Sequence, residues 1–376
     1  MNLADLLTYA DIEQLRRMQE HYGVEGDAHS KHHMICSLLR HLGRPSVLSA
    51  LVYGLEEEER RFLQLLCLDS REVYSMEDLL SKERMAWGKN EGKPRELVSK
   101  GLRSGWLFPG FTSDSRHLYR VPLDFRQRVM RVMAELKRQS LSGDQPEPTV
   151  YRDEQGLIQQ DLKRFLSFVS QHIVQLTSEG AIYRQQQRRL LAQFAVREEL
   201  IMKKGYRFGF GRRYHQYPDR FSLIYDYAYY QGYIAEEMDG YLRLTEAGAG
   251  KIITEGPDET REMIHFWIRL YRHALPCLPV LIRWVDLLAG DRWMSSSDLL
   301  VALEGWVQDY YYETREQLFH RLLKMMLHLG MVCLGEASGG GWLVRMTPLG
   351  RRFLQQGSGL GEKEMEEDFF RPFPTR

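Results

Sequence analysis

A short repeat constrains the fold more than any other feature of this sequence. An apolar residue, Thr, two further residues and Gly recur at residues 176–180, 244–248 and 346–350. Before the second and third copies, apolar and polar residues alternate over 241–244 and 342–346, as in a half-buried strand. Thr245 and Thr347 are good helix N-caps, and Pro348 suits the first helical turn. The repeat therefore predicts two places where a strand runs directly into a helix.

The residues upstream of these two copies predict a hairpin before each helix. Gly232 and Gly330 follow segments of helical character, and Gly is common just past a helix C-terminus. Apolar pairs then begin strands near 233–236 and 331–334, and Gly-containing turns follow them. Each unit is predicted to run helix, strand, turn, strand, helix. This is the second half of a winged helix, in which the hairpin forms the wing.

A looser instance of the same order occurs earlier in the chain. Residues 94–104 predict a helix, 105–108 and 117–121 predict strands, and a further helix begins at Leu123. The predicted fold class is mainly α with small antiparallel β wings, arranged as tandem winged-helix-like domains. The predicted units occupy residues 46–139, 157–257 and 258–356.

The segments outside these units differ in composition. Residues 1–45 predict a small helical module, whose two short helices between Asp11 and Leu42 are weakly similar to a SAP-type DNA-binding module. Residues 140–156 are rich in Pro, Ser and Gly and predict a linker. Residues 357–376 carry five carboxylates and end in Pro-containing sequence, which predicts a mobile acidic tail.

Composition is typical of a globular protein. Hydrophobic residues make up 43% and charged residues 27%, which argues against a disordered or membrane class. No apolar run is long enough for a transmembrane helix, and the first residues carry Asp5 instead of a basic stretch, so we expect no membrane partner. The four cysteines form no CxxC pair and predict reduced thiols of a cytoplasmic protein.

The sequence lacks the motifs of common enzymes. Residues 248–252 and 88–94 resemble a phosphate-binding loop only superficially, because their glycines are misplaced and Ile252 cannot ligate Mg²⁺. No nucleophile elbow or HExxH helix occurs. We therefore predict no catalytic residues, no cofactor and no enzymatic activity.

One cluster has the residue types of a metal site. His29, His32, His33 and Cys36 lie close together, and His32 and Cys36 would share a helical face. Zinc can use such a pair but normally takes four ligands. We expect a solvent-facing histidine cluster, with Cys36 in the local core and no bound metal.

The distribution of charge points to one basic segment. The chain carries 51 basic and 51 acidic residues, but residues 181–215 hold nine Lys/Arg against two Glu. Within this stretch, residues 203–215 combine five cations with four aromatics and three glycines. Cations can neutralise phosphates and aromatics can stack on bases, so the segment predicts nucleic-acid contact. Alternatively, the aromatics pack on the domain, and Arg212 and Arg213 pair with the acidic stretch that follows.

Two helical segments differ in their suitability for reading DNA. Residues 315–329 have an apolar stripe at helical spacing, which favours a recognition helix. Its other side would carry Gln317, His320, Arg321, Lys324 and His328. Residues 219–231 contain four Tyr, two Asp and one Arg, which favours a core or protein-contact element.

A resemblance adds to this interpretation. Residues 173–184, followed by Arg188-Arg189-Leu190, resemble the N-terminal domain found in XPB-type helicases and in bacterial helicase-associated proteins. Those proteins share the apolar-x-Leu-Thr-x-x-Gly segment, a basic helix and later winged-helix units, and the resemblance covers about residues 157–350. It implies a part in DNA repair or transcription. The ATP-binding motor motifs of the helicases are missing here.

We therefore expect a non-catalytic DNA-binding accessory protein in repair, recombination or transcription, with a helicase or nuclease as candidate protein partner. The main alternative is a tandem winged-helix scaffold that binds such a subunit and not DNA; a nuclease with unplaced carboxylates is a third hypothesis. The predicted nucleic-acid-binding residues are Arg184, Arg188, Arg189, Lys203, Lys204, Tyr206, Arg207, Phe208, Phe210, Arg212, Arg213, Arg315, Arg321 and Lys324.

Overall fold

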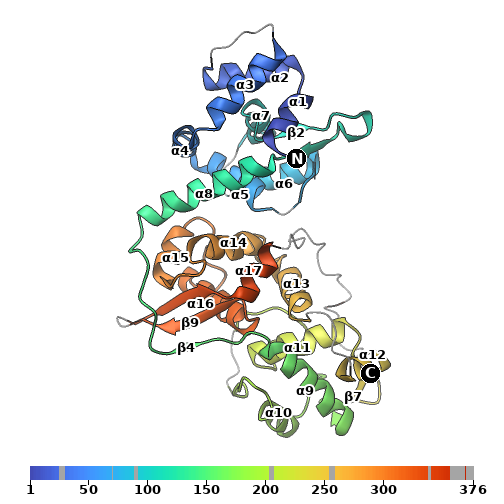
Figure 1. The fold of residues 1–376 in the computed structure, drawn as a ribbon. Coiled ribbons are helices and arrows are strands. Elements are labelled where there is room, and N and C mark those ends of the chain that lie inside the picture. The colour runs from blue at the N-terminus through green and yellow to red at the C-terminus, as the bar shows by residue number, and fades with distance from the viewer. Residues whose placement is uncertain are drawn as a thin grey trace. The chain divides into compact units, whose positions relative to one another are not determined.

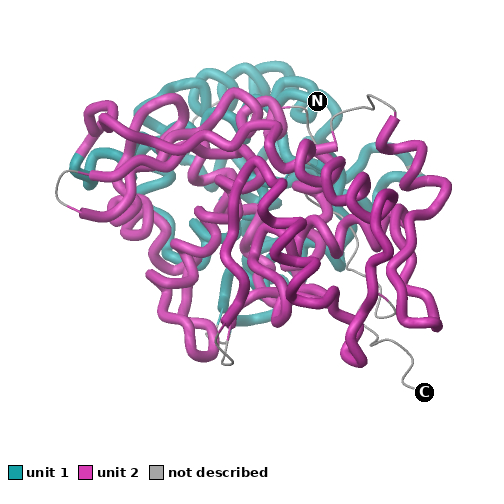
Figure 2. Tube along the Cα trace, turned by 90° about the horizontal axis from the view of Figure 1, so that it is seen from below, with its two compact units in different colours: residues 1–142 teal, residues 143–376 magenta. Residues whose placement is uncertain are grey.

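The chain divides into two compact units, Met1–Ser142 and Gly143–Arg376 (Figures 1 and 2). The structure, a computed structural model, describes residues 1–24, 30–69, 71–88, 92–202, 207–253, 259–337, 340–355 and 369. Within these residues the protein is mainly helical and has three small antiparallel sheets. The predicted class, mainly α with small antiparallel sheets, is thus confirmed.

The N-terminal part of unit 1 is a group of short helices. They are α1 (Leu3–Tyr9), α2 (Ile12–Tyr22), α3 (Lys31–Leu42) and α4 (Pro45–Tyr53). Asp11 caps α2 by accepting the Gln14 N–H at 2.7 Å, and Gly23 ends that helix in the left-handed region. The buried faces of α1 to α3 share one apolar core with Phe108. The predicted helices are present, and their core is continuous with a later part of unit 1.

The remainder of unit 1 alternates helices with very short strands. Its elements are α5 (Glu57–Leu68), β1 (Tyr74–Ser75), α6 (Met76–Trp87), α7 (Glu96–Arg103), β2 (Phe108–Pro109), β3 (Leu118–Arg120) and α8 (Leu123–Gln139), with a 3-10 turn at Ser113–Ser115. The sheet order is β1-β3-β2, and both pairings are antiparallel. The second predicted strand agrees with β3, whereas residues 105–107 are not part of a strand and β2 begins only at Phe108.

Unit 2 contains the same order twice. The first set is α9 (Leu157–Gln171), β5 (Val174–Gln175), α10 (Arg184–Leu191), α11 (Asp219–Tyr230), β6 (Ile234–Glu236), β7 (Tyr241–Leu244) and α12 (Glu246–Ile253). Helix α13 (Glu259–Tyr271) precedes the second set, which is α14 (Leu278–Leu288), β8 (Met294–Ser295), α15 (Ser296–Ala302), α16 (Arg315–His328), β9 (Val332–Glu336), β10 (Trp342–Met346) and α17 (Pro348–Gln355). Strand β7 lies between β5 and β6, and β10 lies between β8 and β9. The two predicted hairpins are confirmed, with β6 paired to β7 and β9 paired to β10.

The Thr-x-x-Gly repeat joins each hairpin to its helix through the same contacts. The Thr347 hydroxyl donates to the Gly330 carbonyl at 2.6 Å and accepts the Gly350 N–H at 2.9 Å. A Cβ on Gly350 would lie 2.4 Å from the Met331 carbonyl oxygen, so only Gly allows this approach. The equivalent contacts in the other copy are made by Thr245, Gly232 and Gly248. The first copy differs, because Thr177 and Gly180 form a tight turn.

The predicted linker, residues 140–156, is partly incorporated into unit 2. The Gln145 N–H donates to the Trp293 carbonyl at 2.8 Å, and β4 (Tyr151–Arg152) pairs with β9 as an edge strand. Pro and Gly in this segment predicted a linker, but Pro is also tolerated beside a sheet edge. The boundary between the units falls at residues 142 and 143, inside this segment.

The C-terminal segment is described at one residue. In the predicted acidic tail the structure describes Phe369, which is buried and packs against the rings of Tyr229, Tyr230 and Phe266. The expectation of a mobile tail is therefore wrong at this residue.

Among the described residues, no helix is both long and apolar enough to span a membrane.

Candidate nucleic-acid interface

The predicted basic segment is only partly described, and its described part turns inward. Lys203, Lys204 and Tyr206 lie outside the described residues. The Arg207 guanidinium donates to the carbonyl oxygens of Tyr214 and Tyr217 and forms an ion pair with Asp219. Arg207 thus connects the basic segment to the start of α11.

Of the two described phenylalanines of this segment, Phe208 belongs to the core of unit 2 and Phe210 is half-buried against it. Phe208 is buried, and its ring meets those of Phe210, Tyr271 and Tyr310 edge to face. Phe210 packs on the same two tyrosines. These aromatic faces contact protein side chains, so they are not presented for stacking on bases.

Arg212 and Arg213 are buried around one carboxylate. Both guanidiniums bond to Glu236, at 3.0 and 2.9 Å, and their side chains are only 5% and 7% exposed. Arg212 also lies over the Tyr229 ring, 4.0 Å from its centroid. Burial disfavours the charge on Arg213, but Glu236 outweighs that effect and raises the pKa of Arg213. As predicted nucleic-acid contacts, Arg212 and Arg213 would lie on the surface, but this is wrong: both are buried, because the buried Glu236 requires cationic partners.

A second buried carboxylate lies next to this pair. Asp226 accepts the backbone N–H of Arg212 at 3.1 Å, and its side chain has no exposed surface. Burial raises the pKa of Asp226 to about 8. Asp226 and Glu236 belong to the acidic stretch after the basic segment, so the alternative pairing of Arg212 and Arg213 with that stretch describes this site better.

The cations predicted on α16 all have acidic partners within unit 2. Arg321 forms a two-pronged ion pair with Glu313, at 2.8 and 2.9 Å, and Lys324 lies 3.2 Å from Asp219. Arg315 pairs with Glu316 at 2.8 Å and approaches Glu304 at 3.7 Å. These contacts leave α16 poorly suited to neutralise phosphates.

The position of His328 differs from the one predicted for it on α16. Helical spacing predicts it on the polar side, but it is buried and lies 2.9 Å from Glu154. Nearby, the buried Arg220 of α11 donates to Asp161 of α9 at 2.6 Å. Burial alone would raise the pKa of Glu154, but His328 and Arg220 hold it below its usual value. This network joins three helices, and no spacing in the sequence indicated it.

Helix α10 carries the remaining predicted cations that the structure describes. Arg184, Arg188 and Arg189 are exposed, and in the part of the chain that the structure describes their side chains have no ion-pair or hydrogen-bond partner. The glutamines between them hold the helix in place. Gln186 accepts the Gln175 N–H at 3.2 Å and donates to the Ile173 carbonyl at 2.7 Å, and Gln187 donates to the Ile182 carbonyl at 2.6 Å.

The surface next to the end of α10 is hollowed and partly basic. A depression of about 450 Å³ is lined by Arg188, Leu191, Ala192, Arg197, Glu198, Glu199, Leu200 and Met202. Arg197 is exposed, while the Glu198 carboxylate accepts two backbone N–H groups at the start of α11, from Arg220 and Phe221. Sequence reasoning did not select Arg197, although it falls within the basic stretch 181–215.

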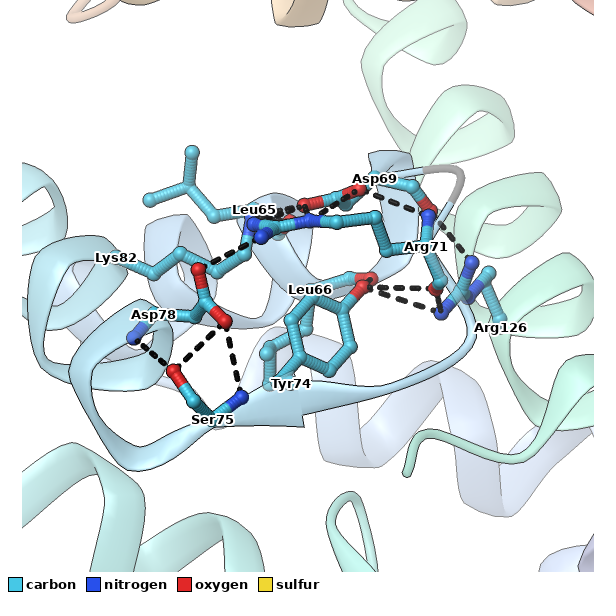
Figure 3. A network of polar contacts seen from close by, with 9 residues as sticks. All are labelled: Leu65, Leu66, Asp69, Arg71, Tyr74, Ser75, Asp78, Lys82 and Arg126. Atoms are coloured by element: carbon cyan, nitrogen blue, oxygen red, sulfur yellow. Dashed lines mark hydrogen bonds and ion pairs between the residues drawn. The ribbon is translucent and has the colours of Figure 1, made fainter. Parts of the chain in front are cut away.

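Unit 1 contains a separate polar network, shown in Figure 3. Asp69 pairs with Lys82 at 2.7 Å and with Arg71 at 2.9 Å, and Arg71 also pairs with Asp78 at 2.7 Å. Burial lowers the pKa of Lys82, whereas Lys82 and Arg71 overcome the burial of Asp69 and hold its pKa below the usual range. Arg126 of α8 donates to the Arg71 carbonyl at 3.0 Å. Asp69 and Asp78 neutralise Arg71 and Lys82, and Arg126 donates to backbone carbonyls, so this network fixes the approach to β1 and is not a candidate site.

The predicted histidine cluster does not form a metal site among the described residues. His29 lies outside the described residues, and His32 Nε2 lies 3.6 Å from Cys36 Sγ on α3. Among the described residues, no group of three or more His, Cys, Asp or Glu side chains is arranged to hold a metal ion.

Comparison of the whole chain with protein-family models, with curated proteins and with solved structures gives no match. The resemblance to the XPB-type N-terminal domain therefore depends on the motif in residues 173–190 and the winged-helix-like order that follows it.

Proposed function

We propose that this chain is a non-catalytic DNA-binding protein, built from tandem winged-helix-like units, that contacts phosphates through α10. The winged-helix assignment is supported by the order helix, strand, helix, helix, strand, strand, which recurs three times in the described residues. In each instance the last strand lies in the middle of the sheet, as β3, β7 and β10 do.

The observation that carries the proposal is the contrast between α10 and the other predicted cations. Arg207, Arg212, Arg213, Arg315, Arg321 and Lys324 each have an acidic partner. Arg184, Arg188 and Arg189 are exposed on one short helix. The planar guanidinium matches phosphate geometry and releases counterions when it binds.

The position of α10 distinguishes this proposal from standard groove reading. In a helix-turn-helix protein the second helix of the motif enters the major groove. The corresponding helix here, α11, is buried over Arg220 to Ala228 and cannot enter a groove. We therefore assign α10 a sequence-independent contact with the backbone.

The resemblance of residues 173–190 suggests the setting. It supports a role in DNA repair, recombination or transcription, in association with a helicase or nuclease subunit. The contact that α10 would make is the part of this proposal that can be measured directly on the purified chain.

The test is a salt-titrated binding assay with duplex and single-stranded DNA. Replacing Arg184, Arg188 and Arg189 by Glu should abolish binding. Replacing them by Gln should reduce the slope of log K against log salt by about 0.9 for each duplex phosphate that is no longer neutralised. A variant with the same change of net charge, made at the exposed helical residues Arg40, Arg131 and Arg352, serves as the control. An equal loss of affinity in both Glu variants would assign binding to net charge and overturn the role of α10.

A further inference from the structure

Two neighbouring tyrosines project from the loop before α16. Tyr311 and Tyr312 are 83% and 80% exposed. They occupy the tip of a two-residue turn, closed by reciprocal backbone hydrogen bonds of 3.0 Å between Tyr310 and Glu313. Large aromatic rings this exposed on an ordered turn are costly to hydrate and are typical anchors of protein interfaces.

The turn is held rigidly at both of its bases. The Tyr310 ring packs on Phe208 and Phe210 in the core of unit 2. Glu313 is buried and holds Arg321 through its two-pronged ion pair. A tip fixed in this way loses little conformational entropy when a partner binds.

The tip also carries backbone strain. Tyr311 has φ +52°, the left-handed region that a bulky residue rarely adopts. Gly or Asn would adopt this backbone conformation with less strain than Tyr does. The Tyr311 ring meets the Tyr310 ring edge to face, with 4.9 Å between centroids, and stays largely exposed. A strained residue with an accessible ring indicates a role for that ring.

The surroundings of the tip are acidic. Glu304 and Asp309 are exposed, and Glu316 is half exposed. Arg315 is the cation among them, and it lies against Glu316 and Glu304. The excess of carboxylates would attract a cationic ligand and repel phosphate.

We propose that Tyr311 and Tyr312 form a docking surface for an arginine-rich segment of a partner protein. Arginine guanidiniums stack on tyrosine rings and pair with carboxylates, so one such segment would use both features of the tip. This surface is independent of α10, because its charge has the opposite sign and its ligand is a polypeptide.

The test uses the full chain and a fluorescein-labelled peptide of alternating arginine and glycine, followed by fluorescence anisotropy. The wild type should bind this peptide and not the matching glutamate–glycine peptide. A variant with Tyr311→Gly and Tyr312→Ala should bind at least about tenfold more weakly. Its melting temperature should not fall, since Gly relieves the strain at position 311. Glu304→Gln should weaken peptide binding by reducing the acidic charge.

Three controls make the outcome decisive. Tyr311→Phe keeps the ring and should retain peptide affinity, and Tyr53→Ala, at a tyrosine that is 64% exposed in unit 1, should not alter it. The variant with Glu at positions 184, 188 and 189 should still bind the peptide, which separates this proposal from DNA binding by α10. Unchanged peptide affinity in the double tyrosine variant would overturn the proposal. Loss of single-stranded DNA binding in that variant, with no peptide binding by the wild type, would replace the protein partner by nucleic acid.

Discussion

Arg220 of α11 and Asp161 of α9 form an ion pair at 2.6 Å in which neither side chain has any exposed surface. Asp161 also accepts the backbone N–H of Ala195 at 2.6 Å, so one carboxylate connects two helices and the chain that follows α10. A charge buried to this degree is stable only with its partner, since transfer from water costs several kcal/mol.

Replacing Asp161 by Ala should therefore destabilise the protein by about 3–5 kcal/mol, because it leaves the buried Arg220 charge with Glu154, 3.5 Å away, in place of its 2.6 Å partner. Urea unfolding followed by far-UV circular dichroism would measure this change. Arg164 also pairs with Asp161, at 3.0 Å, but its side chain is 40% exposed. Arg164→Ala should cost under about 1 kcal/mol. Similar costs for the two variants would contradict the assignment of Arg220 as the essential partner.

Gly350→Ala should lower stability, although Ala normally favours a helix over Gly. The new Cβ would lie 2.4 Å from the Met331 carbonyl oxygen, and the resulting displacement of α17 should cost about 1–3 kcal/mol. Gly250 provides the matched control, since it lies in α12 and a Cβ there meets no atom within 4 Å. Gly250→Ala should stabilise by about 0.4–1 kcal/mol. Thermal unfolding of both variants would show opposite shifts of Tm.

Asp226 should make the stability of the protein fall as the pH rises. Its pKa is about 8 in the folded state, against 3.8 as the reference value. Between these values the unfolded chain releases a proton that the folded chain keeps, so unfolding becomes more favourable with increasing pH. Asp226→Asn should remove this dependence and should be more stable than the wild type near pH 8. An unchanged pH profile of urea unfolding in this variant would contradict the raised pKa.

ATP hydrolysis should be absent from the purified protein, because no segment of the sequence has the spacing of a phosphate-binding loop. A coupled assay of phosphate release, with and without DNA, would measure this. Activity that co-purifies with the chain and is lost on replacing Lys251 by Ala would show that residues 248–252 bind nucleotide after all.

Local chemistry in the sequence determined the two hairpins. Thr347 bonds to Gly330 and Gly350, and these residues lie directly before the hairpin and in the helix that follows it. A pattern with such short connections can be predicted from residue types alone. Strands β7 and β10 accordingly have the predicted bounds, residues 241–244 and 342–346.

Pairing between distant segments could not be predicted in the same way. Strands β1, β4, β5 and β8 are each two residues long, too short for an alternating pattern. Tyr151 and Arg152 are extended because β9, far away in the sequence, offers them a free edge. The sequence around them contains Pro and Gly, which favoured a linker.

Only the tertiary structure decided whether the side chains of the basic segment face the core or the solvent. Arg212, Arg213 and Phe208 have the composition of a nucleic-acid contact, and a core that needs to neutralise buried carboxylates uses the same residue types. Glu236 draws both arginines inward, and Tyr271 and Tyr310 supply the rings against which Phe208 packs. On α10, by contrast, Gln186 and Gln187 make the hydrogen bonds to the rest of the unit, and the arginines are exposed. Side-chain type sets what a residue can bind, but burial and charge partners from distant segments decide whether it is available.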